Sequence, residues 1–193
     1  MTQQQINPVL QKISQLYAEY GGQSYEEKCT QLQHAEQCGT LALEWGLDQE
    51  VALAAFLHDI GHFIAQENSL PGTTSYGYAA HDQLGADFLA HCGFSNRLVL
   101  LIREHVAVKR YLAATKAEYV AKLSHASTVT LQQQGGPMSA AEAELYAQNP
   151  NLKEIILLRT IDDSGKLPEM ACKPLSYWLE LAEVELTKAL SLR

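Results

Sequence analysis

Apolar residues recur at spacings of three and four along almost the whole chain, and no stretch alternates strictly between apolar and polar positions. This periodicity is typical of amphipathic helices and does not favour strands. We therefore predict an all-α fold. The predicted helices cover residues 5–20, 26–45, 48–62, 81–91, 95–114, 116–133, 139–148, 151–162 and 174–191.

Turn-forming residues separate several of these helices. Gly46 can take the left-handed conformation that ends a helix, and Asp48 follows where a side chain can cap the next one. Gly93 stands in the same way before the helix that starts at Ser95. The chain has no internal repeat or low-complexity tract, and 193 residues can share one core. We expect one domain over residues 1–193.

Composition and charge narrow the classes of partner. The chain is 47% hydrophobic and 19% charged, as an ordinary globular protein is. Its net charge of -8 repels polyanions, and the only basic cluster is Arg103, Lys109 and Arg110. We therefore do not expect nucleic acid as a partner.

The chain also lacks the signals of a membrane or secreted protein. Its longest apolar run, 51–57, is too short to span a bilayer, and its N-terminus does not resemble a secretory signal. The four cysteines have no Cys-x-x-Cys spacing, which favours reduced thiols over a zinc knuckle or a disulfide framework. We expect a cytoplasmic protein with no membrane partner; the pattern does not determine an oligomeric state.

The most informative stretch is the end of the apolar helix 51–57, which is followed directly by His58 and Asp59. Burying such groups unpaired is costly, so a compensating group is required, and a metal ion is the strongest candidate. Adjacent helical residues point about 100° apart, but both side chains can reach a cation near the helix end. Asp59 has two oxygens and can bridge two metal ions.

Three further histidines can face the same interior. His34 lies at the edge of the apolar stripe of its helix. His81 begins a helix after a Tyr-rich loop, and His105 follows an apolar run. His91 and His125 fall outside this pattern, and we expect them to be ordinary core or surface residues.

A last carboxylate comes from the helix 151–162. Asp162 is four residues after Leu158, which keeps it on the buried face, and Asp163 is the alternative. Together, four imidazoles and two carboxylates suit iron, manganese or zinc. Six ligands with one bridge leave open positions on two ions, as a catalytic site requires.

The order of these residues resembles the binuclear branch of the HD-domain superfamily. The ordered pattern is His34, His58-Asp59, His81, His105 and Asp162. The surrounding segments 31–34, 56–62 and 105–111, with Leu158-Arg159, are similar to those of the phosphonate-cleaving HD-domain oxygenases. The resemblance covers about residues 20–170, before the helix 174–191. It implies a single HD-domain helical bundle around a binuclear metal site.

The resemblance also implies an activity. In that family a mixed-valent Fe(II)/Fe(III) pair uses O2 to break the carbon–phosphorus bond of 1-hydroxy-2-aminoethylphosphonate or its N-trimethyl analogue. The products are glycine or glycine betaine, and phosphate.

The resemblance also implies roles for residues around the metal ions. His62, Lys109, Ser127 and Arg159 would bind the organophosphonate, because a dianion needs fixed cations and donors. His62 and Lys109 are the expected catalytic residues. Tyr25 and Glu27 would correspond to a Tyr–Glu pair that occupies the site before the substrate arrives and recognises its amine. Glu27 keeps its distance to His34, whereas the spacing from Tyr25 to Glu27 is variable in the family.

Several alternatives stay open at this point. A trimethylammonium substrate would favour an aromatic cage from Tyr25, Tyr76 and Tyr78, whereas a primary ammonium would favour Glu27. The six ligands would also serve a binuclear HD-domain phosphohydrolase that acts on a nucleotide or dinucleotide. A metal-binding sensor without enzymatic activity is a third interpretation.

Overall fold

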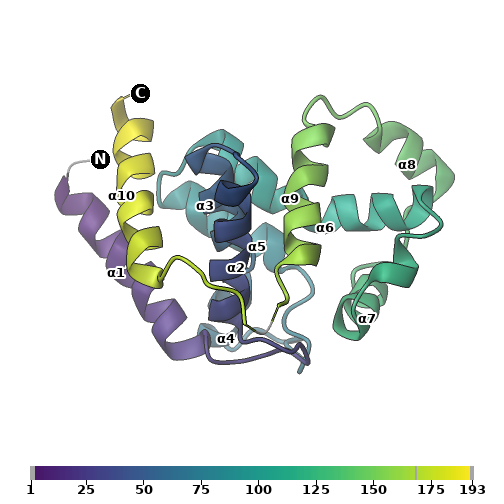
Figure 1. The fold of residues 1–193 in the computed structure, drawn as a ribbon, viewed down its shortest axis with the longest axis horizontal. Helices are drawn as coiled ribbons and strands as arrows, with labels where there is room; N and C mark the ends of the chain where they lie inside the picture. Colours follow the sequence, from purple (N-terminus) through teal and green to yellow (C-terminus); the bar gives the residue numbers. More distant parts are fainter. Residues whose placement is uncertain (1–2, 168, 192–193) are drawn as a thin grey trace.

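The structure, a computed structural model, describes residues 3–167 and 169–191 and is helical, as predicted (Figure 1). The helices are α1 (Gln3–Tyr20), α2 (Gln31–Glu44), α3 (Gln49–Leu57), α4 (Ile60–Glu67), α5 (His81–His91), α6 (Asn96–Thr115), η1 (Val120–Lys122, a 3-10 helix), α7 (His125–Gln133), α8 (Ala140–Tyr146), α9 (Leu152–Ser164) and α10 (Leu175–Ser191). Across the described residues, β-pairing is limited to an isolated bridge between Thr74 and Gly77. None of the described helices has the length and apolar content needed to cross a membrane.

The helix predicted over 26–45 starts later than expected, at Gln31. Thr30 caps it with a capping box, which fixes the start of α2. In the preceding loop, Tyr25 and Glu26 have φ of 44° and 62°. Residues other than glycine are strained in this left-handed region, and such strain concentrates at functional sites.

The helix predicted over 48–62 is in fact two helices, α3 and α4. The chain turns at Asp59, which has φ -96° and ψ 3° and makes no side-chain hydrogen bond to cap α4. Its carboxylate is therefore available to the interior beside His58. The break was not predicted because the apolar pattern continues through both helices.

The prediction of a helix over 116–133 is wrong for the first half of that range. That half contains only the short 3-10 helix η1, and α7 begins where the Ser124 side chain accepts a hydrogen bond from the Ser127 amide. The other predicted boundaries agree with the structure within two residues. Gly46 and Gly93 adopt the expected left-handed conformation, at φ 77° and 91°.

Helix α3 lies in the centre of the hydrophobic core, and its residues from Val51 to Leu57 are all buried. Phe56 stacks on Trp178 of α10 and on Tyr17 of α1, with ring centroids 5.1 and 4.8 Å apart. Helices α1 and α10 lie side by side over this part of the core (Figure 1). The covering holds α3 in place, so that its C-terminal end delivers His58 to the interior.

Helices α4 and α5 approach each other closely at Gly61. A Cβ at this position would lie 1.9 Å from the carbonyl oxygen of His81 and 2.7 Å from the amide nitrogen of Gly85. Only glycine permits this approach. The crossing brings the first residue of α5, His81, next to the turn at Asp59.

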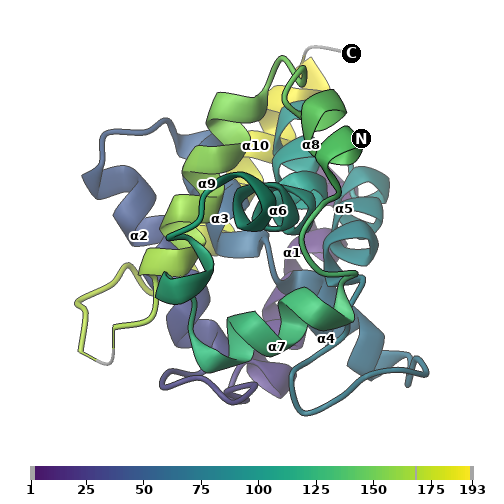
Figure 2. The same ribbon diagram turned by 90° about the vertical axis from the view of Figure 1, so that its right-hand side faces the viewer.

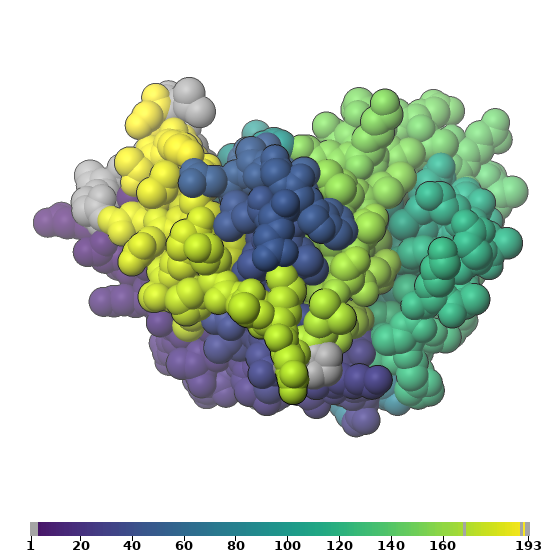
Figure 3. Space-filling model, viewed as in Figure 1, coloured from purple at the N-terminus to yellow at the C-terminus, as the bar shows by residue number. Residues whose placement is uncertain are grey.

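Helix α6 runs through the bundle against α3, α5 and α9, and α7 lies across the lower part of the view in Figure 2. After α9 the chain crosses the face shown in Figure 3 beside α2. Two hydrogen bonds hold this segment to α2: the amide of Leu167 donates to Gln37 Oε1, and the amide of Lys173 donates to Thr40 Oγ1.

Candidate metal centre

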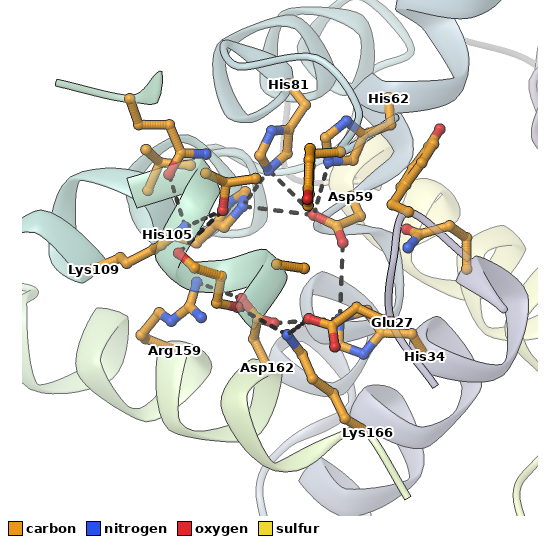
Figure 4. Close-up of a pocket in the computed structure, with 18 of the residues that line it drawn as sticks. Glu27, His34, Asp59, His62, His81, His105, Lys109, Arg159, Asp162 and Lys166 are labelled. Atoms are coloured by element: carbon orange, nitrogen blue, oxygen red, sulfur yellow. Dashed lines mark hydrogen bonds and ion pairs between the residues drawn. The ribbon is translucent and has the colours of Figure 1, made fainter. Parts of the chain in front are cut away.

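Six polar side chains from five parts of the bundle converge on one interior region, and Figure 4 labels all of them except His58. They are His34 of α2, His58 and Asp59 between α3 and α4, His81 of α5, His105 of α6, and Asp162 of α9. All are buried except Asp59, whose side chain is 19% exposed. These are the six residues that the sequence predicts as metal ligands, and the fold brings them together.

Asp59 lies between two pairs of imidazoles and offers one oxygen to each pair. Its Oδ1 is 3.2 Å from His81 Nε2 and 3.7 Å from His105 Nε2. Its Oδ2 is 3.4 Å from His58 Nε2 and 3.7 Å from His34 Nε2. A carboxylate in this position can bridge two cations.

Asp162 completes the group around His34 and His58. Its Oδ1 lies 3.3 Å from His34 Nε2 and 3.7 Å from His58 Nε2. Cys38 is also near, but its Sγ is almost equally far from both nitrogens of His34, at 3.7 and 3.8 Å. The thiol therefore packs against the imidazole ring and does not face the lone pair of Nε2.

All four imidazoles direct Nδ1 at a backbone carbonyl. The pairs are His34 with Gly165, His58 with Ala55, His81 with Tyr78 and His105 with Ile102, at 2.6–2.8 Å. A carbonyl can only accept, so each neutral ring donates from Nδ1 and keeps a lone pair on Nε2. Histidines that bind metals usually have this arrangement.

Two further observations show that these six side chains suit metal ions. The Nε2 atoms of His81 and His105 are 2.9 Å apart, and their lone pairs face each other. Two nitrogen ligands of one cation, at about 2.1 Å and a right angle, stand about 3 Å apart. The Nε2 atom of His58 is buried with no hydrogen-bond partner. Cations in the two groups would satisfy all of these nitrogens.

The charges of the two aspartates also favour the binding of positive charge at this centre. Burial opposes a charge on His58, but Asp59 and Asp162 raise its pKa to about 10. The pKa values of both aspartates are held well below their usual range despite burial, Asp59 mainly by His58 and Asp162 by Arg159 and His58. A metal ion beside His58 therefore competes with a proton, and its binding releases that proton.

His62 differs from the other four imidazoles. The amide of Tyr78 donates to its Nδ1 at 2.8 Å, so the proton of the neutral ring lies on Nε2. Burial and the neighbouring His81 hold its pKa well below the usual value, which keeps the ring neutral. Its Nε2 lies 3.9 Å from Asp59 Oδ1. His62 thus presents an N–H donor to the site, where the other four present lone pairs.

A cavity of about 70 Å³ is lined by the predicted ligands His34, Asp59, His81, His105 and Asp162. Its lining includes all six residues predicted to bind the substrate, which are Tyr25, Glu27, His62, Lys109, Ser127 and Arg159. By a rule of 10–15 Å³ for each water, it has room for roughly five waters. The space suits a molecule of a few heavy atoms.

Lys109 is buried at this cavity among neutral partners. Its Nζ donates to Thr130 Oγ1 and Gln134 Oε1, both at 2.8 Å. Burial, and then the positive charge of Arg159, lower its pKa to about 7. No carboxylate bonds to this ammonium among the described residues, so it can pair with an anion that enters the cavity.

Arg159 joins the cavity to the metal centre. Its Nη1 lies 2.7 Å from Asp162 Oδ2, and its Nη2 donates to Asp163. Asp163 also accepts a hydrogen bond from Tyr119 at 2.8 Å. Asp162 is therefore the aspartate at the metal centre, and Asp163 holds Arg159 from the other side. The Nε atom of Arg159 is buried without a partner.

The structure adds one cation that the sequence did not predict. Lys166 lines the cavity, and its Nζ donates to Glu27 Oε1 at 2.6 Å and to Ser127 Oγ at 2.9 Å. Its distance of four residues from Asp162 was the available signal, but Lys166 lies beyond the end of α9.

Two predictions around the cavity need correction. The basic cluster of Arg103, Lys109 and Arg110 does not exist as a cluster, because Arg103 pairs with Asp87 and Arg110 with Glu142. The cations at the cavity are instead Lys109, Arg159 and Lys166. Of the three tyrosines considered for an aromatic cage, Tyr25 and Tyr76 line the cavity and Tyr78 does not.

Tyr25 lies against His62, with ring centroids 4.9 Å apart, and its hydroxyl accepts a hydrogen bond from Gln66 Nε2 at 2.6 Å. Burial is the main cause that raises its pKa. The tyrosine is therefore a neutral phenol at the edge of the site. His91 and His125, which fall outside the predicted pattern, are exposed.

Residues 31–161 match the HD domain family. Three relatives are similar over most of their length. The [1-hydroxy-2-(trimethylamino)ethyl]phosphonate dioxygenase (glycine-betaine-forming) of Leisingera caerulea is 38% identical over 88% of this chain and 85% of its own. The hydroxymethylphosphonate dioxygenase of Gimesia maris is 37% identical over 80% and 77%. An uncharacterized protein of Acanthamoeba polyphaga mimivirus is 37% identical over 92% and 82%.

Proposed function

Because the chain belongs to the HD-domain family of phosphonate oxygenases, we propose that it uses O2 to cleave the carbon–phosphorus bond of a small 1-hydroxyalkylphosphonate. The observation that carries this proposal is the position of Asp59 between two sets of side chains, His81 with His105 and His34 with His58 and Asp162. A small cavity with three cationic side chains lies beside them. The substrates expected from the sequence are 1-hydroxy-2-aminoethylphosphonate and its N-trimethyl analogue, with glycine or glycine betaine and phosphate as products. The similarity to a hydroxymethylphosphonate dioxygenase adds a third candidate without an amine.

The residues support iron as the metal. Asp59, His81 and His105 are two imidazoles and one carboxylate, the set typical of non-haem iron oxygenases. His34, His58 and Asp162 would hold the second ion. When bound, a mixed-valent iron pair would supply open coordination positions for O2 and substrate and a route by which electrons pass from the substrate to O2.

The side chains at the cavity suit a phosphonate dianion. Lys109 has a free N–H and Arg159 a buried, unbonded Nε, so each can donate to a phosphonate oxygen. His62 can donate from Nε2 while it remains neutral. Charge-assisted hydrogen bonds from fixed donors would orient the carbon–phosphorus bond toward the metal centre.

The cavity does not favour the phosphohydrolase alternative. A space of about 70 Å³ is far smaller than a nucleotide needs. The basic residues at the site are also few, since Arg103 and Arg110 pair elsewhere. A small phosphonate accounts better for this combination of size and charge.

Oxygen uptake measured together with phosphate release tests the proposal. Conversion of a 1-hydroxyalkylphosphonate to a carboxylate and phosphate balances with one O2, whose four electrons all come from the substrate carbon. We expect one O2 consumed for each phosphate released, with the iron-loaded protein and the three candidate substrates assayed in parallel. Equal phosphate release in anaerobic buffer would contradict an oxygenase and support hydrolysis.

A further inference from the structure

Lys166 joins three separate segments at the mouth of the cavity. It lies directly after α9, its partner Glu27 lies in the loop before α2, and its other partner Ser127 lies on α7. Figure 4 shows the Lys166 and Glu27 side chains meeting beside Asp162. The Lys166 side chain is only 19% exposed and that of Glu27 is 15% exposed, so water screens this pair weakly.

Glu27 would be an unfavourable neighbour for a phosphonate if Lys166 did not pair with it. Its carboxylate lines the same cavity as Lys109 and Arg159, which are the expected partners of the dianion. Like charges brought together in a partly buried site repel strongly. The neighbouring cations are already paired with other groups, because Lys109 bonds to the neutral side chains of Thr130 and Gln134 and Arg159 pairs with two aspartates.

Lys166 also determines which way the Ser127 hydroxyl can donate. Because Ser127 Oγ accepts the Lys166 ammonium at 2.9 Å, the hydroxyl hydrogen points elsewhere and can donate to another acceptor. The Ser124 hydroxyl adds to the arrangement by donating to Glu27 Oε1 at 2.6 Å.

We propose that Lys166 is a positioning and specificity-determining residue, which neutralises Glu27 inside the substrate cavity and orients the Ser127 hydroxyl toward a bound phosphonate. The inference rests on the proposed function, since it assumes that the cavity binds a phosphonate. It assigns a role to a partly buried ammonium that the sequence motifs do not cover. It also predicts that the effect of losing Lys166 depends on whether Glu27 keeps its charge.

The test measures binding of methylphosphonate, which lacks the 1-hydroxyl group, to the metal-loaded protein by titration calorimetry. We expect Lys166→Met to weaken binding about tenfold or more, because it leaves Glu27 as a bare carboxylate. The double variant Lys166→Met/Glu27→Gln should recover most of the affinity, and Lys166→Arg should retain it. In turnover assays the loss should appear mainly in KM.

Lys12→Met is the matched control, because Lys12 forms an ion pair with Glu67 at 2.5 Å outside the cavity. We expect it to bind like the wild type. If wild-type protein binds no methylphosphonate, this inference fails, whereas the proposed function is decided separately by the assay of O2 uptake and phosphate release. If the wild type binds and Lys166→Met binds equally well, only the inference fails. If Lys166→Met binds methylphosphonate more weakly and the double variant does not recover the affinity, the inference is also overturned. Loss of a lysine with a purely structural role would have this effect.

Discussion

At the scale of single residues, Lys109 determines how the cavity responds to pH. Its ammonium is buried among neutral partners, and its pKa is about 7. A bound dianion favours the charged form of this side chain. Above pH 7 the free protein must therefore take up a proton when it binds a phosphonate, and this requirement opposes binding.

We predict that wild-type affinity for methylphosphonate falls above pH 7, relative to the Lys109→Arg variant, by up to about tenfold for each pH unit. The guanidinium of the variant stays charged throughout this range. Both proteins bind the same ligand at each pH, so the ratio of their affinities does not depend on the titration of the ligand. Calorimetric titrations from pH 6 to pH 9 measure both proteins. A constant ratio of the two affinities over the whole range would show that Lys109 does not need its charge for binding.

The sequence predicted the residues at the site unevenly. The six converging residues were predictable because five of them lie on or directly after an apolar helical segment and because the order of all six matches a family pattern. His81, which follows a Tyr-rich loop, depended on that order. Lys166 was not predictable, since its contact with Glu27 links positions far apart in the sequence and lies beyond a helix end. The expected basic cluster was wrong because Lys109 is buried at the cavity, whereas Arg103 and Arg110 pair with Asp87 and Glu142, and positions along the sequence do not show these pairs.

At the scale of elements, the turn between α3 and α4 places His58 and Asp59, and the crossing of α4 with α5 places His81. Helical periodicity predicted most elements, but it missed this turn because both helices are apolar. The crossing depends on Gly61, whose neighbours leave no room for a side chain. This close approach could not be predicted from one sequence, because the pattern does not show which helices touch.

We predict that Gly61→Ala destabilises the protein by about 1–3 kcal/mol or more, because α5 must move away from the new methyl group. The shift of His81 should also lower the metal content. Gly22→Ala is the matched control, since a Cβ there would contact nothing within 4 Å. Urea unfolding and metal analysis measure both effects. Equal stability of the two variants would show that the α4–α5 contact is looser than described.

At the scale of the whole molecule, the bundle buries imidazole and carboxylate groups in an arrangement that could hold two cations. Helices α2, α5, α6 and α9 and the α3–α4 turn each deliver at least one of the six residues. Four of the imidazoles donate from Nδ1 to a backbone carbonyl, and this bond directs the lone pair of Nε2 toward the interior. Only the bond from His34 to Gly165 is a tertiary contact, because the other three histidines bond to the residue three positions earlier. The sequence predicted the residues of the centre but not the orientation of their rings, since the apolar pattern does not specify side-chain rotamers.

The most direct test of this account is the number of iron ions bound by each chain, measured by elemental analysis after purification with iron under reducing conditions. We predict close to two in the wild type and in His125→Ala, whose side chain is exposed and outside the centre. His81→Ala should lose about half of the iron or more, because it removes a ligand of one ion. Wild-type protein without bound transition metal, or iron lost in His125→Ala but kept in His81→Ala, would contradict the account.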